Sequence, residues 1–246
     1  MSDPDAKKKT EEVEKDSWAG SFALPETQDD WKMLEKLGKL KNSTLHSIKK
    51  MASGSKVLQV PRGKYYASDE AIVNAALLLF LQAVTGLSGN HDVKWTIERV
   101  SFKLDFTNAR FTTITDGAMV TKNSGKTRGL CEVKRKQLGH TDQSAATVSK
   151  QETAELVGLI KNNGSTVFLN GHHHLTSQYA NEIYLLFAKA QVSYHEYLKK
   201  GAIGNDDFLV IQRCGPWRVN DPACMEQLAV IILAIVLLAD KARFVS

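Results

Sequence analysis

Cysteine and proline are both scarce in this chain of 246 residues, which contains three cysteines and five prolines. Cys131, Cys214 and Cys224 show no CxxC spacing and no cysteine–histidine pattern of the zinc-binding type. Three scattered cysteines cannot form a disulfide framework, so reduced thiols in a cytosolic or nuclear protein are the simpler interpretation. The lack of cysteine chemistry also favours oxygen ligands for any metal ion that the protein binds.

Long hydrophobic runs are also missing. The longest, Leu228 to Ala239, has 12 residues, fewer than the roughly 18–20 that span a bilayer. This run is apolar on all sides, which is typical of a helix buried in a protein core. The first 14 residues have charges but no apolar stretch behind them, unlike a secretory signal. We therefore expect a soluble cytoplasmic or nuclear protein with no signal peptide, no transmembrane segment and no membrane partner.

The composition is that of a globular protein with a modest excess of positive charge. The sequence has 32 Lys and Arg against 27 Asp and Glu, for a net charge of +5, and 43% of its residues are hydrophobic. These values exclude a wholly disordered or collagen-like chain, and the length suits one domain with an appendage. We expect a flexible charged tail at 1–17, a lead-in with an amphipathic helix at 18–64, and a folded domain at 65–246.

Hydrophobic periodicity and turn residues predict an alternation of helices and strands in the folded domain. The expected elements are a helix at 71–84 capped by Ser68 or Asp69, strands at 93–106, 109–121 and 129–136, a polar loop at 137–149, a helix at 151–161 capped by Ser149, strands at 165–169 and 181–190, a short helix at 192–199, a strand at 207–213, and a final helix that begins at Pro222. A short strand is also expected earlier, at 56–60. This order predicts an α/β domain with a mixed sheet flanked by helices.

The strand at 129–136 carries the residues that point most clearly to chemistry. Alternation places Glu132 and Lys134 on one face, about 6–7 Å apart along the strand. A turn near 123–128 would bring Asp116 of the preceding strand beside Glu132, with the Val133 carbonyl between them. Two carboxylates and a carbonyl suit Mg²⁺ or Mn²⁺, which prefer oxygen ligands. Lys134 would then orient the attacking water and offset the charge of a phosphoryl transition state.

Thr115-Asp116-Gly117 followed by Glu132-Val133-Lys134 resembles the motif of the PD-(D/E)XK nuclease superfamily, with threonine in place of the family's proline. The resemblance implies a restriction-endonuclease-like αβββαβ core. It further implies that Glu70, at the start of the first helix, is an accessory acidic residue able to contact the metal. Gln151 would be the polar residue that often opens the following helix.

A narrower resemblance covers roughly residues 65–241. The sequences QETAELVGLI at 151–160, NEIYLLFA at 181–188 and CGPWRV at 214–219, together with the final apolar helix, are similar to fungal nuclease-like domains of crinkler-type effectors and selfish toxin proteins. This resemblance implies a metal-dependent nuclease that acts as an effector or toxin. Many proteins with such folds act as dimers, so a homodimer is one expected assembly.

Six cationic side chains occur within 15 residues around the predicted hairpin. Lys134 is one, and the others are Lys122, Lys126, Arg128, Arg135 and Lys136. Around a phosphodiesterase site these five would contact nucleic-acid phosphates without reading the sequence, with DNA preferred to RNA as partner. The alternative is a solvated hairpin tip.

Two other interpretations stay open at the level of sequence. Glu132 and Lys134 could form an exposed ion pair with no catalysis, and the domain could be an inactive nuclease fold that binds nucleic acid or a protein. The run His172-His173-His174 invites a metal assignment, but consecutive strand residues point to opposite faces. We expect this run to form a polar turn before a strand.

Overall fold

The computed structural model describes residues 69–87, 89, 92–106, 109–138, 142–164, 169–201 and 208–241. The expected tail at 1–17, the amphipathic helix within 18–64 and the strand at 56–60 lie outside these residues. The described elements are α4 (Glu70–Leu87), β1 (Val93–Thr96), β2 (Ser101–Phe106), β3 (Ala109–Ile114), β4 (Gly117–Thr121), β5 (Thr127–Lys134), α5 (Asp142–Asn163), the 3₁₀ turn η2 (Leu169–Gly171), β6 (His172–Tyr179), β7 (Glu182–Lys189), α6 (Val192–Lys200), β8 (Val210–Arg218) and α7 (Pro222–Lys241).

Six strands form one mixed sheet in the order β1-β4-β5-β6-β7-β8. Neighbouring strands are antiparallel except β5 and β6, which are parallel. The expected α/β class with a mixed sheet flanked by helices is therefore confirmed. The elements α4, β1, β4, β5, α5 and β6 follow the αβββαβ order, and the hairpin β2–β3 is inserted after the first strand.

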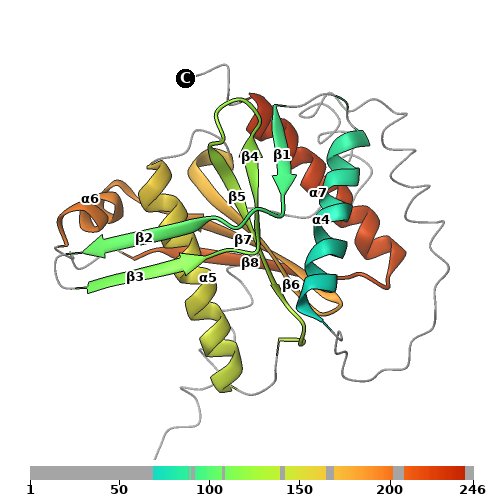
Figure 1. Ribbon diagram of the computed structural model, residues 1–246, viewed down its shortest axis with the longest axis horizontal. Helices are drawn as coiled ribbons and strands as arrows, with labels where there is room; N and C mark the ends of the chain where they lie inside the picture. The colour runs from blue at the N-terminus through green and yellow to red at the C-terminus, as the bar shows by residue number, and fades with distance from the viewer. Residues whose placement is uncertain are drawn as a thin grey trace, which may run out of the picture. The chain divides into compact units, whose positions relative to one another are not determined.

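Helices cover both faces of this sheet (Figure 1). On one face, Leu130 of β5 packs in a buried cluster with Leu156 and Ile160 of α5. On the other face, a Cβ at Gly117 would lie about 3.3 Å from Leu78 of α4. Helix α7 contacts α4 and β8, and α6 lies beside α5. The sheet is thus enclosed between α4 with α7 and α5 with α6.

The starts of α4 and α7 follow ordinary capping chemistry. Asp69 Oδ1 accepts a hydrogen bond from the N–H of Ala71 at 2.9 Å, and Asp221 Oδ1 accepts one from the N–H of Ala223 at 2.9 Å. Asp69 therefore acts as the expected cap, and Pro222 stands at the first position of α7. Helix α4 extends to Leu87, beyond the expected end, so Gly86 lies inside the helix.

Helices α4 and α7 are also long and apolar enough to cross a membrane by length and composition. Their apolar windows are 33% and 44% buried within the fold. The core helices of soluble proteins have the same composition, so this property alone assigns no location.

The two long strands expected at 93–106 and 109–121 are each broken in two. The chain leaves the sheet after Thr96 and returns at Gly117, and the intervening residues form the β2–β3 hairpin. The base of the hairpin is closed where Thr115 N–H donates to Val100 O at 3.0 Å. Phe102 packs directly over Gly158 of α5, where an added Cβ would lie only 2.7 Å from the ring. Burial of the hairpin on α5 therefore interrupts both strands.

The expected loop at 137–149 is wrong, because α5 begins at Asp142 and Ser149 lies inside the helix. The expected histidine turn is also wrong. His172, His173 and His174 begin β6, and the last two are 2% and 0% exposed. Strand β8 runs from Val210 to Arg218, later than the strand expected at 207–213. The short helix expected at 192–199 is present as α6, which spans Val192–Lys200 and so ends one residue later.

Candidate active site

Strand β5 carries Glu132 and Lys134 on the face that packs against α5. Leu130, two residues earlier on the same face, belongs to the hydrophobic cluster under α5. Glu132 is 1% exposed, the Lys134 side chain is 26% exposed, and the two form an ion pair. The pair is therefore not on the surface, as the non-catalytic interpretation supposed, because its carboxylate is buried.

Asp116 lies at the bend between the hairpin and β4, where the main chain re-enters the sheet. Its N–H donates to Cys131 O at 3.1 Å, and its Oδ2 accepts a hydrogen bond from the N–H of Val133 at 3.1 Å. Asn74 of α4 donates its side-chain amide to the Asp116 carbonyl at 3.0 Å. These three bonds fix the Asp116 carboxylate against the end of β5.

The Val133 carbonyl faces the same side of β5 as Asp116. Within a strand, the N–H and C=O of one residue point toward the same edge. The Val133 N–H points to Asp116, and pairing with β4 ends at Gly117 opposite Cys131. The carbonyl is thus available on the side where the Asp116 carboxylate lies.

Glu70 reaches the same end of the sheet from the first turn of α4. Its Oε2 accepts a hydrogen bond from the N–H of Arg135 at 3.4 Å, just after β5 ends. Its charge also acts on Lys134, whose pKa it helps to raise. The accessory acidic residue implied by the family resemblance is therefore brought to the Lys134 side of the site.

Gln151 of α5 lies over the carboxylate of Glu132. Its Nε2 donates to Glu132 Oε1 at 2.5 Å and to Glu155 Oε1 at 3.0 Å. Glu155 was missed in the sequence, although its i,i+4 spacing from Gln151 places both on one face of the helix. It is 0% exposed. Asp116, Glu132 and Glu155 together are called the acidic cluster below.

Burial and mutual repulsion strongly raise the pKa values of Glu132 and Glu155. Burial raises the pKa of Glu132 to about 7, with attraction to Lys134 opposing the rise and repulsion from Asp116 adding to it. Burial, followed by repulsion from Glu132, raises the pKa of Glu155 to about 9. For Lys134, burial alone would lower the pKa, but attraction to Glu132, with smaller contributions from Glu70 and Asp116, raises it overall. Lys134 is thus an ammonium group and a hydrogen-bond donor at neutral pH.

The predicted phosphate-contacting side chains divide between the two ends of the β4–β5 hairpin. Arg135 and Lys136 directly follow β5 and lie near the cluster. In contrast, Lys122, Lys126 and Arg128 lie around the turn at the opposite end. Five residues of β4 separate that turn from Asp116, or about 16 Å at the rise of a strand. Of the five, only Arg135 and Lys136 therefore lie at the end of the hairpin that carries the acidic cluster.

Arg99 provides a cation that the sequence interpretation missed. Its guanidinium lies 3.5 Å from Asp116 Oδ1, and its side chain is 69% exposed. It precedes the inserted hairpin, so its proximity depends on the hairpin returning to the sheet beside its starting point. Arg99 therefore faces both Asp116 and solvent.

The donor atoms at the end of β5 fit a hard divalent cation. All are oxygens, and Glu132 Oε2 is buried without a hydrogen-bond partner. An unpartnered buried carboxylate oxygen is costly unless a cation or proton satisfies it. Among the residues that the structure describes, no group of three or more His, Cys, Asp and Glu side chains is already arranged to hold a metal. Glu132 Oε1 is instead engaged by Lys134 and Gln151.

The histidines at the start of β6 belong to the core. Burial lowers the pKa of His173 to about 4 and that of His174 to about 3, so both are neutral at pH 7. His174 lies between Trp95 and Phe187, with ring centroids 6.0 and 5.8 Å away. Its ring also bonds the hydroxyl of Thr176 at 3.0 Å. These contacts give His174 a packing role.

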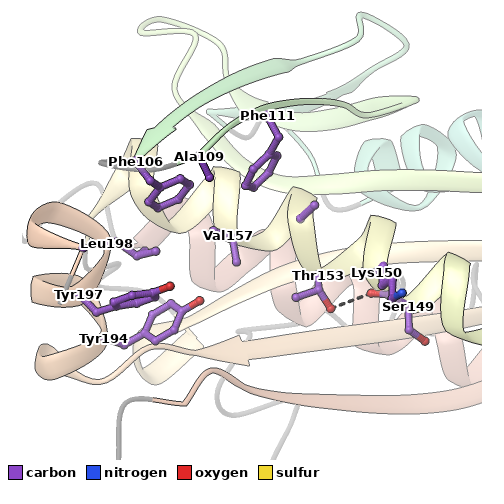
Figure 2. A pocket seen from close by; sticks show the side chains of 12 residues that line it. Phe106, Ala109, Phe111, Ser149, Lys150, Thr153, Val157, Tyr194, Tyr197 and Leu198 are labelled. Carbon is purple, nitrogen blue, oxygen red and sulfur yellow. Dashed lines mark hydrogen bonds between the residues drawn. The ribbon is translucent and has the colours of Figure 1, made fainter. Parts of the chain in front are cut away.

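An aromatic cavity of about 640 Å³ lies elsewhere, between the β2–β3 hairpin, α5 and α6 (Figure 2). Phe106 and Phe111 of the hairpin line it opposite Tyr194 and Tyr197 of α6. Lys150 is the one charged side chain in its lining, and no carboxylate takes part. Gln151 and Glu155 do not line it, so this cavity is separate from the acidic cluster.

Comparison with known proteins assigns no family or function to this chain, so a function must be inferred from the site. Neither the models of protein families, nor the curated proteins, nor the solved structures gave a match to this chain.

Proposed function

We propose that this protein is a metal-dependent nuclease that hydrolyses phosphodiester bonds, with DNA as the first candidate substrate and RNA as the second. The observation that carries the proposal is the convergence of Asp116, Glu132, Lys134, Gln151 and Glu70 at the end of β5. They come from four separate segments of the chain. A buried carboxylate paired with a lysine and bordered by a second carboxylate suits phosphoryl transfer better than it suits simple structural support.

The oxygens of Asp116, Glu132 and Val133 would hold Mg²⁺ or Mn²⁺, with Glu70 as an outer acidic residue. A cation bound there would acidify a water molecule and polarise the scissile phosphate. Metal binding would compete with Lys134 for Glu132 Oε1, which the ammonium group occupies in the structure. Lys134 would thereby be released toward the substrate.

Lys134 acts as a donor in this scheme because its pKa is raised. The ammonium group would orient the attacking water and stabilise the negative charge that grows on the phosphoryl oxygens. The water oxygen loses a proton and forms a bond to phosphorus while the bond to the leaving oxygen breaks and that oxygen gains a proton, which yields a phosphate monoester end and a hydroxyl end. Gln151 positions Glu132 throughout, since it donates to that carboxylate.

Cleavage of labelled DNA and RNA in Mg²⁺, in Mn²⁺ and in EDTA tests the proposal. We expect cleavage that EDTA abolishes and that Asp116→Asn reduces by at least about 100-fold. Asp105→Asn is the matched control, because Asp105 is an exposed hairpin residue paired with Arg110. Cleavage by Asp116→Asn at the wild-type rate would overturn the assignment.

A second candidate is an inactive nuclease fold that binds nucleic acid or a protein. The closed ion pair between Lys134 and the buried Glu132 favours it, because this pair can be stable without a metal. Binding of DNA or RNA that persists in EDTA, without cleavage of either, would support this candidate over the nuclease.

The proposed cellular role is that of an effector or toxin. This role predicts that expression of the wild-type chain reduces host viability, whereas Lys134→Ala protein expressed at the same level does not. Equal toxicity of the two would separate any toxic effect from the proposed hydrolysis.

A further inference from the structure

Glu132 and Glu155 are two buried carboxylates held by one amide. Gln151 Nε2 lies 2.5 Å from Glu132 Oε1 and 3.0 Å from Glu155 Oε1. These two distances together limit the separation of the Oε1 atoms to 5.5 Å at most. The remaining oxygen of each carboxylate, Oε2, is buried and receives no hydrogen bond from a protein donor, and the two carboxylates lie close enough to share a proton or a cation. Both residues are at least 99% buried.

The positive charge beside these carboxylates is too small to balance them. Lys134 forms an ion pair with Glu132. In the described part of the chain, Glu155 forms no ion pair with lysine or arginine. One ammonium group therefore faces two carboxylates, and Asp116 adds a third acidic group nearby. Uncompensated buried charge is strongly unfavourable, so a further cation or a proton must satisfy the pair.

Glu152, on the same helix, shows that burial alone does not produce this imbalance. It is 1% exposed, yet it accepts a hydrogen bond from the Tyr179 hydroxyl and pairs with Arg213. Both of its oxygens are thus satisfied within the protein. The chain supplies complete partners for one buried carboxylate of α5 and leaves the other incomplete beside the proposed metal ligands.

We propose that Glu155 is a further ligand of the divalent cation at this site, bound from α5 opposite the ligands of β5. The inference rests on the proposed function for the choice of Mg²⁺ or Mn²⁺ as the cation. The oxygens that would meet the cation are the Oε2 atoms of Glu132 and Glu155, since Gln151 donates to both Oε1 atoms. Glu155 then anchors the cation to α5, while Asp116 and Glu132 anchor it to the sheet.

Mn²⁺ binding by the full chain tests this inference without any nucleic acid. Protein stripped with EDTA is titrated with Mn²⁺, and free Mn²⁺ is followed by electron paramagnetic resonance. We expect Glu155→Gln to weaken Mn²⁺ affinity at least about tenfold, because it removes one ligand charge and keeps the side-chain shape. The matched control, Glu152→Gln, should keep wild-type affinity. Equal affinity of Glu155→Gln and wild type would overturn the inference and leave the pair bridged by a proton.

Thermal unfolding provides a second measurement that depends on the same site. Without metal, Glu155→Gln should melt at a higher temperature than wild type near pH 7, since glutamine needs no proton uptake on folding, whereas buried Glu155 must take up a proton. With saturating Mn²⁺, the wild type should gain more in melting temperature than the variant. An equal gain in both proteins would contradict the inference.

Different results would overturn the nuclease proposal and the proposed role of Glu155 as a cation ligand. Mn²⁺ binding that depends on Glu155, with no cleavage of DNA or RNA, would support the cation site and overturn the nuclease. Cleavage that depends on Asp116, with Mn²⁺ affinity insensitive to Glu155→Gln, would support the nuclease and overturn the role of Glu155.

Discussion

Gln151 is the residue on which the geometry of the acidic cluster depends. One amide group donates to two carboxylates that would otherwise repel each other in a buried position. Its role could be anticipated only in part, because the family resemblance placed Gln151 at the site but not Glu155. The i,i+4 spacing puts Gln151 and Glu155 on one face of α5. Only the three-dimensional structure shows that this face meets Glu132.

Replacing Gln151 with leucine should therefore destabilise the protein beyond the loss of ordinary hydrogen bonds. We expect the free energy of unfolding in EDTA to fall by about 1–3 kcal/mol, because two buried carboxylates lose their shared donor. Chemical denaturation measures this change. Gln82→Leu is the control, since Gln82 is exposed and donates one hydrogen bond, to Trp95 O at 3.1 Å. Equal losses in the two variants would show that the Gln151 bonds have no special importance.

At the scale of elements, the periodicity of the sequence did not show that the hairpin β2–β3 is separate from the main sheet. Alternation along 93–106 and 109–121 predicts strands correctly but cannot show that each stretch changes sheets midway. Asp116 nevertheless lies beside β5, as expected. The chain returns to the sheet directly after the hairpin, and at this bend the Asp116 N–H donates a hydrogen bond to Cys131 O of β5. The local pattern thus predicted β5 and its two site residues, while long-range packing decided the rest.

For helix α5 the error was different, because the first turns of a helix were predicted as a loop. Its first part is polar, so residues 137–149 lack the apolar periodicity that marks a helix, and its start at Asp142 was missed. Similarly, three histidines suggested a polar turn, although His173 and His174 are neutral and buried in β6. Tertiary contacts with Trp95 and Phe187 outweighed the polarity of His174.

Contact between the hairpin and α5 predicts opposite effects for two glycine substitutions. Gly158→Ala should lower the free energy of unfolding by about 1–2 kcal/mol, because the added Cβ would lie 2.7 Å from the Phe102 ring. Gly86→Ala should raise it by about 0.5 kcal/mol, since Gly86 lies within α4 and its Cβ would meet nothing within 4 Å. Denaturant titration of both variants measures the changes. A Gly158→Ala protein as stable as Gly86→Ala would refute the tight hairpin contact.

At the scale of the whole molecule, the basic side chains of the described segment 122–136 divide between two ends of one hairpin. Lys122, Lys126 and Arg128 lie at the far end of the β4–β5 hairpin, whereas Arg135 and Lys136 follow β5. A nucleic acid bound at the site would therefore have to extend about 16 Å along the hairpin to meet the whole basic segment 122–136. The average composition of the sequence gave no indication of this division, which follows from the direction of the two strands.

The acidic cluster should also govern how the stability of the whole protein depends on pH. The pKa of Glu155 is raised from 4.5 to about 9, so the folded protein holds a proton that the unfolded chain releases above pH 4.5. Stability contributed by that proton is lost as pH rises through the folded pKa. In EDTA, we expect the free energy of unfolding to fall by about 1–2 kcal/mol between pH 7 and 8.5.

The control for this pH dependence is Glu155→Gln, which cannot titrate at that position. Its unfolding free energy should change less than that of wild type over the same range. Parallel pH profiles for the two proteins would show that Glu155 does not hold a proton in the folded, metal-free state. His173 and His174 do not contribute in this range, because both are neutral above pH 7 in the folded protein.

The most direct test of the central claim compares wild type with Lys134→Met in a nucleic-acid cleavage assay with Mn²⁺. The variant keeps an unbranched side chain that is one atom shorter, but it loses the ammonium group that pairs with Glu132. We predict that wild type cleaves and that Lys134→Met is slower by at least about 100-fold, while it still binds Mn²⁺. Equal cleavage by the two proteins, or no cleavage of DNA or RNA by wild type, would contradict a catalytic role for the end of β5.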